Sequence, residues 1–255
     1  MGIEIDLRHK LVLVTGAAGR IGTIISRKCA ECGADLILLD REILKDRLDE
    51  LAQNLKSIYG NSCISFACDL QNIGDKYIRE KVDNFNVIDV LVNCAGVNII
   101  KSSLDITEKE WDDVVDINLK WNFFLTQLVA RKAIKTDTEL SIINIGSQHG
   151  VVGNIHRAPY CSSKGGIVIL TKALAVEWAK YKIRVNCVSP SYVISEDNFQ
   201  CLMNPNTKKD YLKNIPIGRY CEAEDVANTV VFLASSISSY ITGENILVDG
   251  GYTAR

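Results

Sequence analysis

The sequence contains little that would interrupt regular structure, cross a membrane or bind a polyanion. Only four of the 255 residues are proline, so long helices and strands are expected. No apolar run approaches the ~18 residues that a membrane-spanning helix needs. The 29 basic and 31 acidic residues leave a net charge of −2, which argues against a nucleic-acid partner. The first residues lack the basic and apolar regions of a signal peptide, so we expect a cytoplasmic protein with no membrane partner.

The cysteines carry no clear disulfide or metal signature. Their number, nine, is odd, and in a chain without an export signal this is typical of free thiols. Cys29 and Cys32 have the spacing of a metal-binding or redox pair, but no second pair of this kind accompanies them. We therefore expect small apolar core residues and no metal site.

Segments rich in Val, Ile and Leu alternate with segments of helical periodicity along the whole chain. Runs such as Leu11–Val14 and Leu36–Leu39 are apolar throughout, as in strands buried on both faces of a parallel sheet. The alternation predicts an α/β fold: a doubly wound, Rossmann-like parallel β-sheet flanked by helices on both faces, in a single domain over residues 1–255. The expected strands are Lys10–Thr15, Asp35–Asp40, Cys63–Cys68, Val87–Val92, Leu140–Gly146, Arg184–Val188 and Asn245–Val248. The expected helices are Arg20–Cys32, Glu42–Tyr59, Asn72–Phe85, Thr107–Lys135, Pro159–Lys180 and Glu222–Ser235.

The least regular part of the chain is the segment 189–220, which holds three of the four prolines. A long irregular segment inside a compact domain usually has a function. We expect it to act as a substrate-binding or lid segment.

A glycine-rich turn follows the first expected strand, in the sequence Thr15-Gly-Ala-Ala-Gly-Arg-Ile-Gly22. Glycines allow a sharp turn and a close approach to a pyrophosphate, and the following helix offers free N–H groups. The second strand ends in Asp40, eighteen residues after Gly22. A carboxylate there can accept hydrogen bonds from both hydroxyls of an adenosine ribose, so the two features together predict dinucleotide binding.

Tyr160 and Lys164 are four residues apart in an expected helix and therefore share one face. Alone, such a pair is more often an ordinary feature of a helix. A phenol has a pKa of about 10, but a neighbouring ammonium and a cationic nicotinamide would stabilise its phenolate. Ser147 lies thirteen residues before Tyr160, at the expected carboxyl end of a strand where ligands bind in this architecture.

Together these motifs resemble the short-chain dehydrogenase/reductase family, in its compact single-domain branch, over essentially the whole chain. Thr15–Gly22 resembles the family's phosphate-binding turn, and Asn93-Cys-Ala-Gly96 its motif after the fourth strand. The resemblance implies four catalytic residues, Asn118, Ser147, Tyr160 and Lys164, with Asn118 anchoring a water that relays protons. It also implies that Asp69 binds the adenine amino group, that Ser189-Pro190 and Val193 form the nicotinamide loop, and that Val248–Gly251 is the C-terminal signature.

The sequence departs from the family pattern at four positions. Arg20 occupies the place of the middle glycine of the turn, and Cys94 replaces the second asparagine of the motif after the fourth strand. Ser191 and Ser195 replace a glycine and a threonine of the nicotinamide loop. The residues expected to contact the cofactor are Gly16, Gly19, Arg20, Ile21, Gly22, Asp40, Asp69, Leu70, Asn93, Ala95, Gly96, Tyr160, Lys164, Pro190, Val193 and Ser195.

The implied reaction is the NAD(P)(H)-dependent interconversion of a secondary alcohol and a ketone. Asp40 would repel a 2′-phosphate, so NAD(H) is the expected cofactor, with NADP(H) kept as an alternative because Arg20 and Arg41 are close in sequence. The segment between Ser147 and Tyr160 is polar, which favours a sugar, polyol or sugar acid as substrate. The expected substrate-binding residues are Ser147, His149, Asn154 and Tyr160.

Two other functions are consistent with the sequence. One is a reductase of 3-oxoacyl thioesters on an acidic carrier protein, for which Arg131, Lys132 and Lys135 would supply a basic docking face. The other is a non-catalytic nucleotide-binding scaffold, which would not need all four catalytic residues. The helix Pro159–Lys180 is apolar on more than one face, and this together with the resemblance predicts a homo-oligomer, a tetramer.

Overall fold

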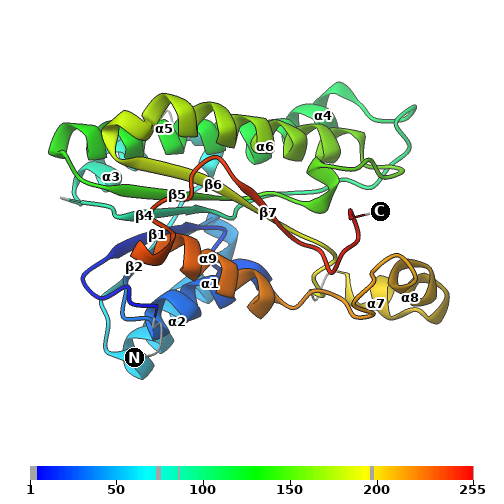
Figure 1. Ribbon diagram of the computed structural model, residues 1–255, viewed down its shortest axis with the longest axis horizontal. Helices are drawn as coiled ribbons and strands as arrows, with labels where there is room; N and C mark the ends of the chain where they lie inside the picture. The colour runs from blue at the N-terminus through cyan, green and yellow to red at the C-terminus, as the bar shows by residue number, and fades with distance from the viewer. Residues whose placement is uncertain (1–4, 73–75, 86, 196–197, 255) are drawn as a thin grey trace.

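A computed structural model describes residues 5–72, 76–85, 87–195 and 198–254. Seven strands of this described part form one parallel sheet in the order β3-β2-β1-β4-β5-β6-β7 (Figure 1). The strands are β1 (Leu11–Thr15), β2 (Asp35–Asp40), β3 (Cys63–Ala67), β4 (Val90–Asn93), β5 (Leu140–Ile145), β6 (Ile183–Pro190) and β7 (Asn245–Val248). The α-helices are α1 (Arg20–Glu31), α2 (Lys45–Tyr59), α3 (Lys76–Asp83), α4 (Glu108–Val115), α5 (Trp121–Thr136), α6 (Ala158–Trp178), α7 (Phe199–Met203), α8 (Pro205–Leu212) and α9 (Ala223–Ala234).

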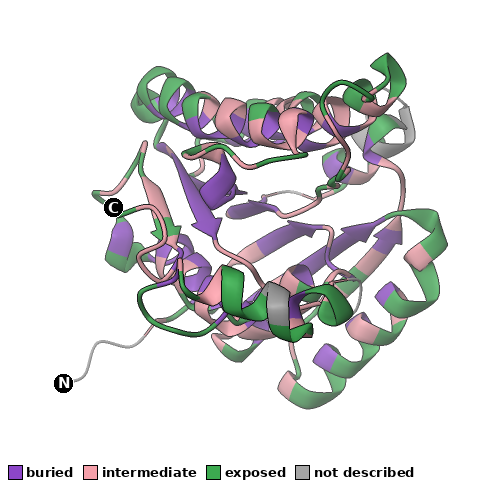
Figure 2. Ribbon diagram, turned by 90° about the vertical axis from the view of Figure 1, so that its right-hand side faces the viewer, coloured by how far each residue is buried: buried purple, intermediate pink, exposed green. Residues whose placement is uncertain are grey.

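Helices cover both faces of the sheet, as the sequence predicts. In Figure 1, α1, α2 and α9 lie on one side, and α4, α5 and α6 lie on the other. Side chains alternate between the two layers along β1: Val12 and Val14 belong to the core under α1 and α9, and Leu13 to the core under α5 and α6. Because both faces are covered, the central strands are buried along almost their whole length (Figure 2). The doubly wound α/β fold is therefore confirmed.

The strand order places the site. The chain moves from β1 outward to β2 and β3, and then returns to place β4 on the other side of β1. The turns that leave β1 and β4 consequently run to opposite faces of the sheet, and a crevice opens between them. Thr15 and Asn93 are register partners at this edge, so the glycine-rich turn and the segment 94–96 start side by side.

The expected helix Thr107–Lys135 is interrupted. The structure has α4, a wide π-type turn at Asp116–Lys120, and then α5. Thr107 does begin α4: its side chain and that of Glu110 form a reciprocal cap. The interruption follows from Asn118, whose side chain is bound to other parts of the chain, as described below. Helical periodicity alone does not reveal such a turn.

Other boundaries shift by a few residues. In the described part of the expected helix Asn72–Phe85, α3 covers Lys76–Asp83, and residues 73–75 lie outside the described residues. The strand β6 continues to Pro190 rather than ending at Val188. The segment 189–220 contains the short helices α7 and α8, which stand out from the body of the molecule in Figure 1. In the described part of the chain, no helix combines the length and apolar character that a membrane crossing requires.

The turn after β1 generates a prediction about stability. A methyl group at Gly22 would overlap the carbonyl group of Gly16, whose backbone is fixed by the turn. We expect Gly22→Ala to lower the free energy of unfolding by about 3 kcal/mol or to prevent folding, because overpacked backbone has no low-energy way to relax. Urea denaturation followed by circular dichroism measures this loss.

Gly153→Ala is the matched control. No atom lies within 4 Å of the position of its Cβ, and its φ is not positive, so its stability should change by less than about 1 kcal/mol. Equal stabilities of the two variants would show that the turn tolerates a side chain.

Candidate active site

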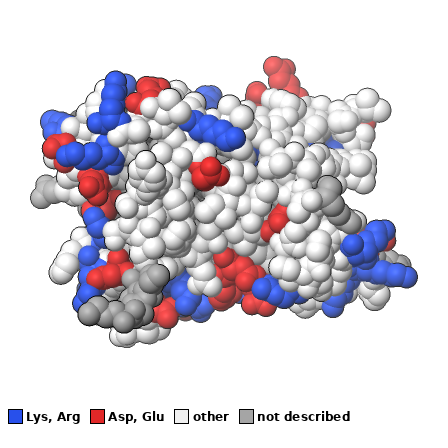
Figure 3. All heavy atoms as spheres, viewed as in Figure 1, with Lys and Arg blue, Asp and Glu red and all other residues white. Residues whose placement is uncertain are grey.

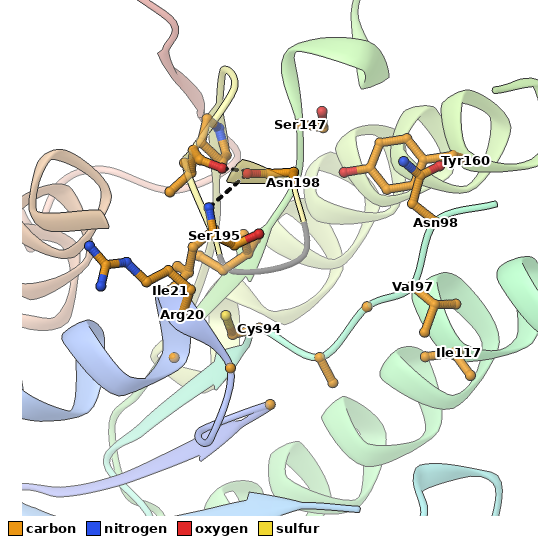
Figure 4. A pocket seen from close by; sticks show the side chains of 18 of the residues that line it. Arg20, Ile21, Cys94, Val97, Asn98, Ile117, Ser147, Tyr160, Ser195 and Asn198 are labelled. Carbon is orange, nitrogen blue, oxygen red and sulfur yellow. Dashed lines mark hydrogen bonds between the residues drawn. The ribbon is translucent and has the colours of Figure 1, made fainter. Parts of the chain in front are cut away.

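One elongated cavity of about 1060 Å³ opens along the carboxyl edge of the sheet. The turns and loops that follow β1, β2, β3, β4, β5 and β6 line it, together with residues of α6 and α7. Figure 4 shows Arg20 and Ile21 toward one end of this cavity, and Ser147, Asn98 and Tyr160 toward the other. The site therefore has two ends, which the sheet brings together from distant parts of the sequence.

The glycine-rich turn is held tightly against the neighbouring strand. Gly16 has a φ of +63°, which favours glycine, and a Cβ there would lie 2.8 Å from the Cα of Ala95. The Thr15 hydroxyl oxygen accepts hydrogen bonds from the backbone N–H groups of Cys94 and Ala95, both at 3.1 Å. These contacts fix the turn and the segment 94–96 as two walls of one crevice.

The start of α1 is suited to an anion. Gly19 occupies the N-cap position, so no side chain caps the helix, and no acidic residue lies in its first turn. The first N–H groups of a helix lack partners within the helix and carry the positive end of its dipole. Gly16, Gly19, Arg20, Ile21 and Gly22 all line the cavity here. The donor set therefore fits a pyrophosphate.

Asp40 is buried at the end of β2 and lines the same end of the cavity. One carboxylate oxygen accepts from the backbone N–H of Ala18 at 2.9 Å, and the other from that of Arg41 at 2.8 Å. Each oxygen keeps acceptor capacity for another donor. Asp69 and Leu70 line the cavity beside Asp40. A ribose and a base fit these residues.

Lys164 is buried on α6 at the opposite end. Its ammonium group donates to the carbonyl oxygen of Ile145 at 2.7 Å and lies 5.9 Å from the centroid of the Tyr160 ring. A single carbonyl leaves two ammonium protons for other acceptors. The pair that the sequence places on one helix face does line the cavity together.

Ser147 follows β5, and its neighbours hold it against α6. Its hydroxyl oxygen accepts from the backbone N–H of His149 at 3.1 Å. Gly150 lies so close to α6 that a Cβ there would be 2.7 Å from the carbonyl oxygen of Lys164. This contact places Ser147 beside the pair Tyr160 and Lys164, and Figure 4 shows Ser147 and Tyr160 at the same end of the cavity.

Asn118 lies behind this group and does not line the cavity. Its side-chain oxygen accepts from the N–H of Val97 at 2.8 Å, and its amide nitrogen donates to the carbonyl of Val97 at 2.9 Å and to the Ser163 hydroxyl at 3.0 Å. A Cβ at Gly96 would lie 3.2 Å from this oxygen and 3.5 Å from the Lys164 nitrogen. Asn118 is thus close to Lys164 and completely buried.

Asn93 also lies outside the cavity, although the sequence groups it with the cofactor residues. Its amide nitrogen donates to the hydroxyl of Thr126 and to the side-chain oxygen of Asn144, both at 2.8 Å. Asn144 in turn donates to Thr171 at 3.0 Å. These buried groups tie β4 and β5 to α5 and α6, beneath the site.

The segment after Ser147 brings His149 and Asn154 together. The Asn154 amide lies 3.2 Å from Nε2 of His149 and 3.3 Å from the hydroxyl of Tyr192, to which it donates. Burial, and after it the positive charge of Arg157, lower the pKa of His149 to about 4. His149 is therefore neutral at physiological pH. His149 lines the cavity, whereas Asn154 does not line it and contacts His149 and Tyr192, which do.

The segment after β6 supplies Pro190, Val193 and Ser195 to the cavity. Asn198 holds this loop: its side-chain oxygen accepts from the N–H of Ser195 and its amide donates to the carbonyl of Val193, both at 2.8 Å (Figure 4). The sequence did not single out Asn198.

Four further polar side chains line the substrate end without being assigned to a site by the sequence: Asn98, Gln148, Arg157 and Tyr192. Gln148 and Arg157 belong to the polar segment between Ser147 and Tyr160, whereas for Asn98 and Tyr192 the only available signal was proximity in sequence to assigned residues. Tyr192 stacks on Tyr211 with ring centroids 4.4 Å apart, and also contacts His149 and Tyr252. Burial raises the pKa of Tyr192 above its usual range, so it stays protonated.

Comparisons with known proteins agree with this geometry. The family profile described as enoyl-(acyl carrier protein) reductase matches residues 16–253. The NAD-dependent glycerol dehydrogenase of Listeria innocua is 36% identical over 99% of this chain and 97% of its own length. The 2-dehydro-3-deoxy-D-gluconate 5-dehydrogenase of Dickeya dadantii is 35% identical over 98% of both chains. A 3-oxoacyl-[acyl-carrier-protein] reductase of Chlamydia pneumoniae is 35% identical over 98% of this chain and all of its own.

A solved structure shares the fold. The gluconate 5-dehydrogenase of Burkholderia cenocepacia, in complex with NADP and tartrate, superposes with a TM-score of 0.92 at 28% identity, over 99% of this chain and 98% of its own. The sheet order, the two-ended cavity and these full-length relatives lead to one conclusion. The chain belongs to the short-chain dehydrogenase/reductase family of NAD(P)-dependent oxidoreductases.

Proposed function

We propose that this protein is a dehydrogenase that oxidises one secondary hydroxyl group of a small polyhydroxylated substrate, and that it uses NAD(H) in preference to NADP(H). The observation that carries the proposal is the convergence of Ser147, Tyr160 and Lys164 at one end of a cavity whose other end holds the glycine-rich turn and Asp40. One end of the cavity thus offers a residue for acid/base catalysis, and the other end offers a site for a dinucleotide.

A nicotinamide cofactor bound in this cavity would supply the acceptor for a hydride from the substrate carbon. Tyr160, as phenolate, takes the proton of the hydroxyl group, while the Ser147 hydroxyl holds the oxygen in place. The carbon loses a hydride and the oxygen loses a proton, so the alcohol becomes a ketone. Lys164 places its positive charge beside this tyrosine, 5.9 Å from the centroid of the ring. Asn118 holds the backbone of Val97 beside Lys164 and supports the route by which the proton leaves.

Polar lining at the substrate end supports a hydroxylated substrate. Asn98, Gln148 and His149 offer donors and acceptors there, and Tyr192 adds a hydroxyl group. The relatives named for glycerol and for a deoxygluconate support the same class. We therefore favour a sugar, polyol or sugar acid. The segment 189–220, with α7 and α8, would cover this end as a lid.

The alternative is a 3-oxoacyl-thioester reductase, which the relative from Chlamydia pneumoniae represents. It would need a basic surface for an acidic carrier protein. Arg131 and Lys135 are exposed on α5, whereas the Lys132 ammonium donates to the carbonyl oxygen of Asp83. Turnover of acyl thioesters compared with polyols distinguishes the two functions.

The outward face of α6 supports a homotetramer. Ile169, Ala173 and Val176 are exposed and repeat at helical spacing, with Ile169 64% and Val176 84% exposed. β7 forms an edge of the sheet and exposes Leu247. Figure 3 shows uncharged surface over much of the face of Figure 1, interrupted by a few acidic side chains. All nine cysteines are free thiols, which supports a cytoplasmic location.

The role of Tyr160 leads to the first functional prediction. Tyr160→Phe removes the acid/base and leaves the ring that shapes the cavity, so cofactor affinity should stay unchanged while kcat falls about 10²- to 10⁴-fold. Fluorescence titration with NADH and steady-state kinetics measure the two effects. Tyr181→Phe, at an exposed tyrosine beyond the end of α6, is the control. Retention of more than about a third of kcat in Tyr160→Phe would contradict the role, since acid/base groups contribute far more.

The position of Asp40 leads to the second functional prediction. Asp40→Ser removes the carboxylate that would face a 2′-phosphate, so the ratio of kcat/KM for NAD to that for NADP should fall by about one to three decades. Asp69→Ser is the comparison variant, because an adenine contact affects both cofactors equally. If the ratio stayed unchanged in Asp40→Ser, Asp40 would not determine the choice between NAD and NADP. Arg20 and Arg41, which also line the cavity, would then be the residues to test.

The exposed apolar residues of α6, namely Ile169, Ala173 and Val176, form a stripe that leads to the third functional prediction. Light scattering should give four times the 28.2 kDa chain mass for the unaltered protein. Val176→Lys places a charge in the stripe and should yield smaller species, whereas Ile58→Lys, at a 69% exposed position on α2, should not. A monomer at micromolar concentration before any substitution would disprove the tetramer.

A further inference from the structure

Arg157 is a charged residue that the reaction as proposed does not use. It occupies the N-cap position of α6, three residues before Tyr160, and it lines the same cavity. Its backbone is fixed from both sides: its carbonyl accepts from the N–H of Cys161 at 2.8 Å, and the preceding carbonyl, that of His156, accepts from the N–H of Lys101 at 3.0 Å. A residue fixed in this way is suited to positioning a ligand.

The guanidinium group of Arg157 has no partner in the described chain. It is half-buried, yet it makes no ion pair or hydrogen bond with any described residue. The other half-buried arginines of the described chain do have partners: Arg27 binds Glu224, and Arg184 donates to carbonyl groups at the end of α9. A partly desolvated guanidinium normally binds an acceptor, and a carboxylate matches its fork of donors.

The charges along the cavity point to an anionic ligand at this end. The charged described residues that line the cavity are Arg20, Asp40, Arg41, Arg47, Asp69, Arg157 and Lys164. Both acids belong to the end that fits the adenosine. At the substrate end only Arg157 and Lys164 are cationic, and Lys164 is bound to Ile145 beside Tyr160. His149 adds no charge because its pKa is about 4.

A carboxylate suits this arrangement better than a phosphate. A phosphate dianion usually takes several donors or a helix N-terminus, but here one guanidinium is present, and Pro159, the second residue of α6, removes one N–H from the first turn. Arg157 and Tyr160 are three residues apart at the start of one helix, where side chains leave the backbone about 5–6 Å apart. One hydroxyl at Tyr160 and a carboxylate at Arg157 therefore fit a short carbon chain.

We propose that Arg157 binds the carboxylate of the substrate, so that the protein acts on a sugar acid rather than on a neutral polyol or a sugar phosphate. The inference rests on the proposed function and narrows its substrate class. Asn98, Gln148 and His149 then face the hydroxyl groups between the two anchoring points. The carboxylate is bound without taking part in the reaction, so it contributes to affinity and orientation.

The test compares molecules that differ in one group. D-Gluconate and D-sorbitol share a carbon skeleton and differ at one end, where a carboxylate replaces a hydroxymethyl group. D-Sorbitol 1-phosphate carries a phosphate at that same end. NADH formation gives kcat and KM, and calorimetry gives affinity for the complex of the protein with NADH. The unaltered protein should bind and oxidise gluconate in preference to the other two molecules.

Arg157→Gln should weaken gluconate binding and raise its KM by about 10- to 100-fold, with a smaller effect on kcat. The affinity and the KM for sorbitol should change by less than about threefold, and Arg157→Lys should retain part of the gluconate affinity that Arg157→Gln loses. Arg8→Gln, at an arginine whose side chain is 72% exposed, is the control. Thermal unfolding of each variant excludes loss of the fold as the cause.

Three outcomes would overturn the inference. The unaltered protein could bind gluconate no more tightly than sorbitol, or bind the sugar phosphate more tightly than gluconate. Alternatively, Arg157→Gln could lower the affinities for gluconate and for sorbitol by the same factor. Calorimetry decides this even if none of the three molecules is oxidised. Failure of the proposed function gives a different result, namely no hydride transfer with any alcohol or ketone in the presence of NAD(H) or NADP(H).

Discussion

The site depends on the close packing of the turn after β1 against the start of α1 and against the segment that follows β4. Gly22 packs on the carbonyl of Gly16, and Gly16 packs on the backbone of Ala95. No side chain fits at either position, so α1 can begin directly at the sheet edge and direct its free N–H groups into the crevice. The crevice exists only because the strand order separates the turns after β1 and β4. A small change in this packing would move the proposed cofactor site relative to Ser147 and Tyr160.

A second set of buried polar contacts fixes the reacting end. Lys164 is tied to the carbonyl of Ile145, and Asn118 is tied to both backbone groups of Val97 and to Ser163. Buried polar groups are costly unless they are satisfied, so each of these contacts selects one arrangement of β5, α6 and the turn between α4 and α5. The interruption of the expected helix at Asn118 is the local consequence. The preorganised geometry that acid/base chemistry needs is thus provided by the same bonds that stabilise the fold.

The substrate end differs from the cofactor end in its charge. Two carboxylates and three arginines lie around the adenosine side, whereas Arg157 and Lys164 provide the charge near Tyr160 among the described residues. The neutral state of His149 follows from its burial, which lowers its pKa, and from the nearby guanidinium. Selection among hydroxylated substrates would then depend on one electrostatic contact together with the neutral donors and acceptors around it.

The sequence by itself determined the α/β class, the parallel sheet and the order of the elements, because continuous apolar strands and glycine-rich turns are local features with a direct physical meaning. It also pointed to many of the residues that line the cavity, such as Gly16, Asp40 and Tyr160, through their positions at strand ends or on one helix face. Only the tertiary structure decided that Asn93, Asn118 and Asn154 do not line the cavity, and that Asn98 and Tyr192 do. Spacing along the chain cannot decide this, because burial and hydrogen-bond partners come from segments more than twenty residues away, as Val97 is from Asn118 and Tyr192 from Asn154.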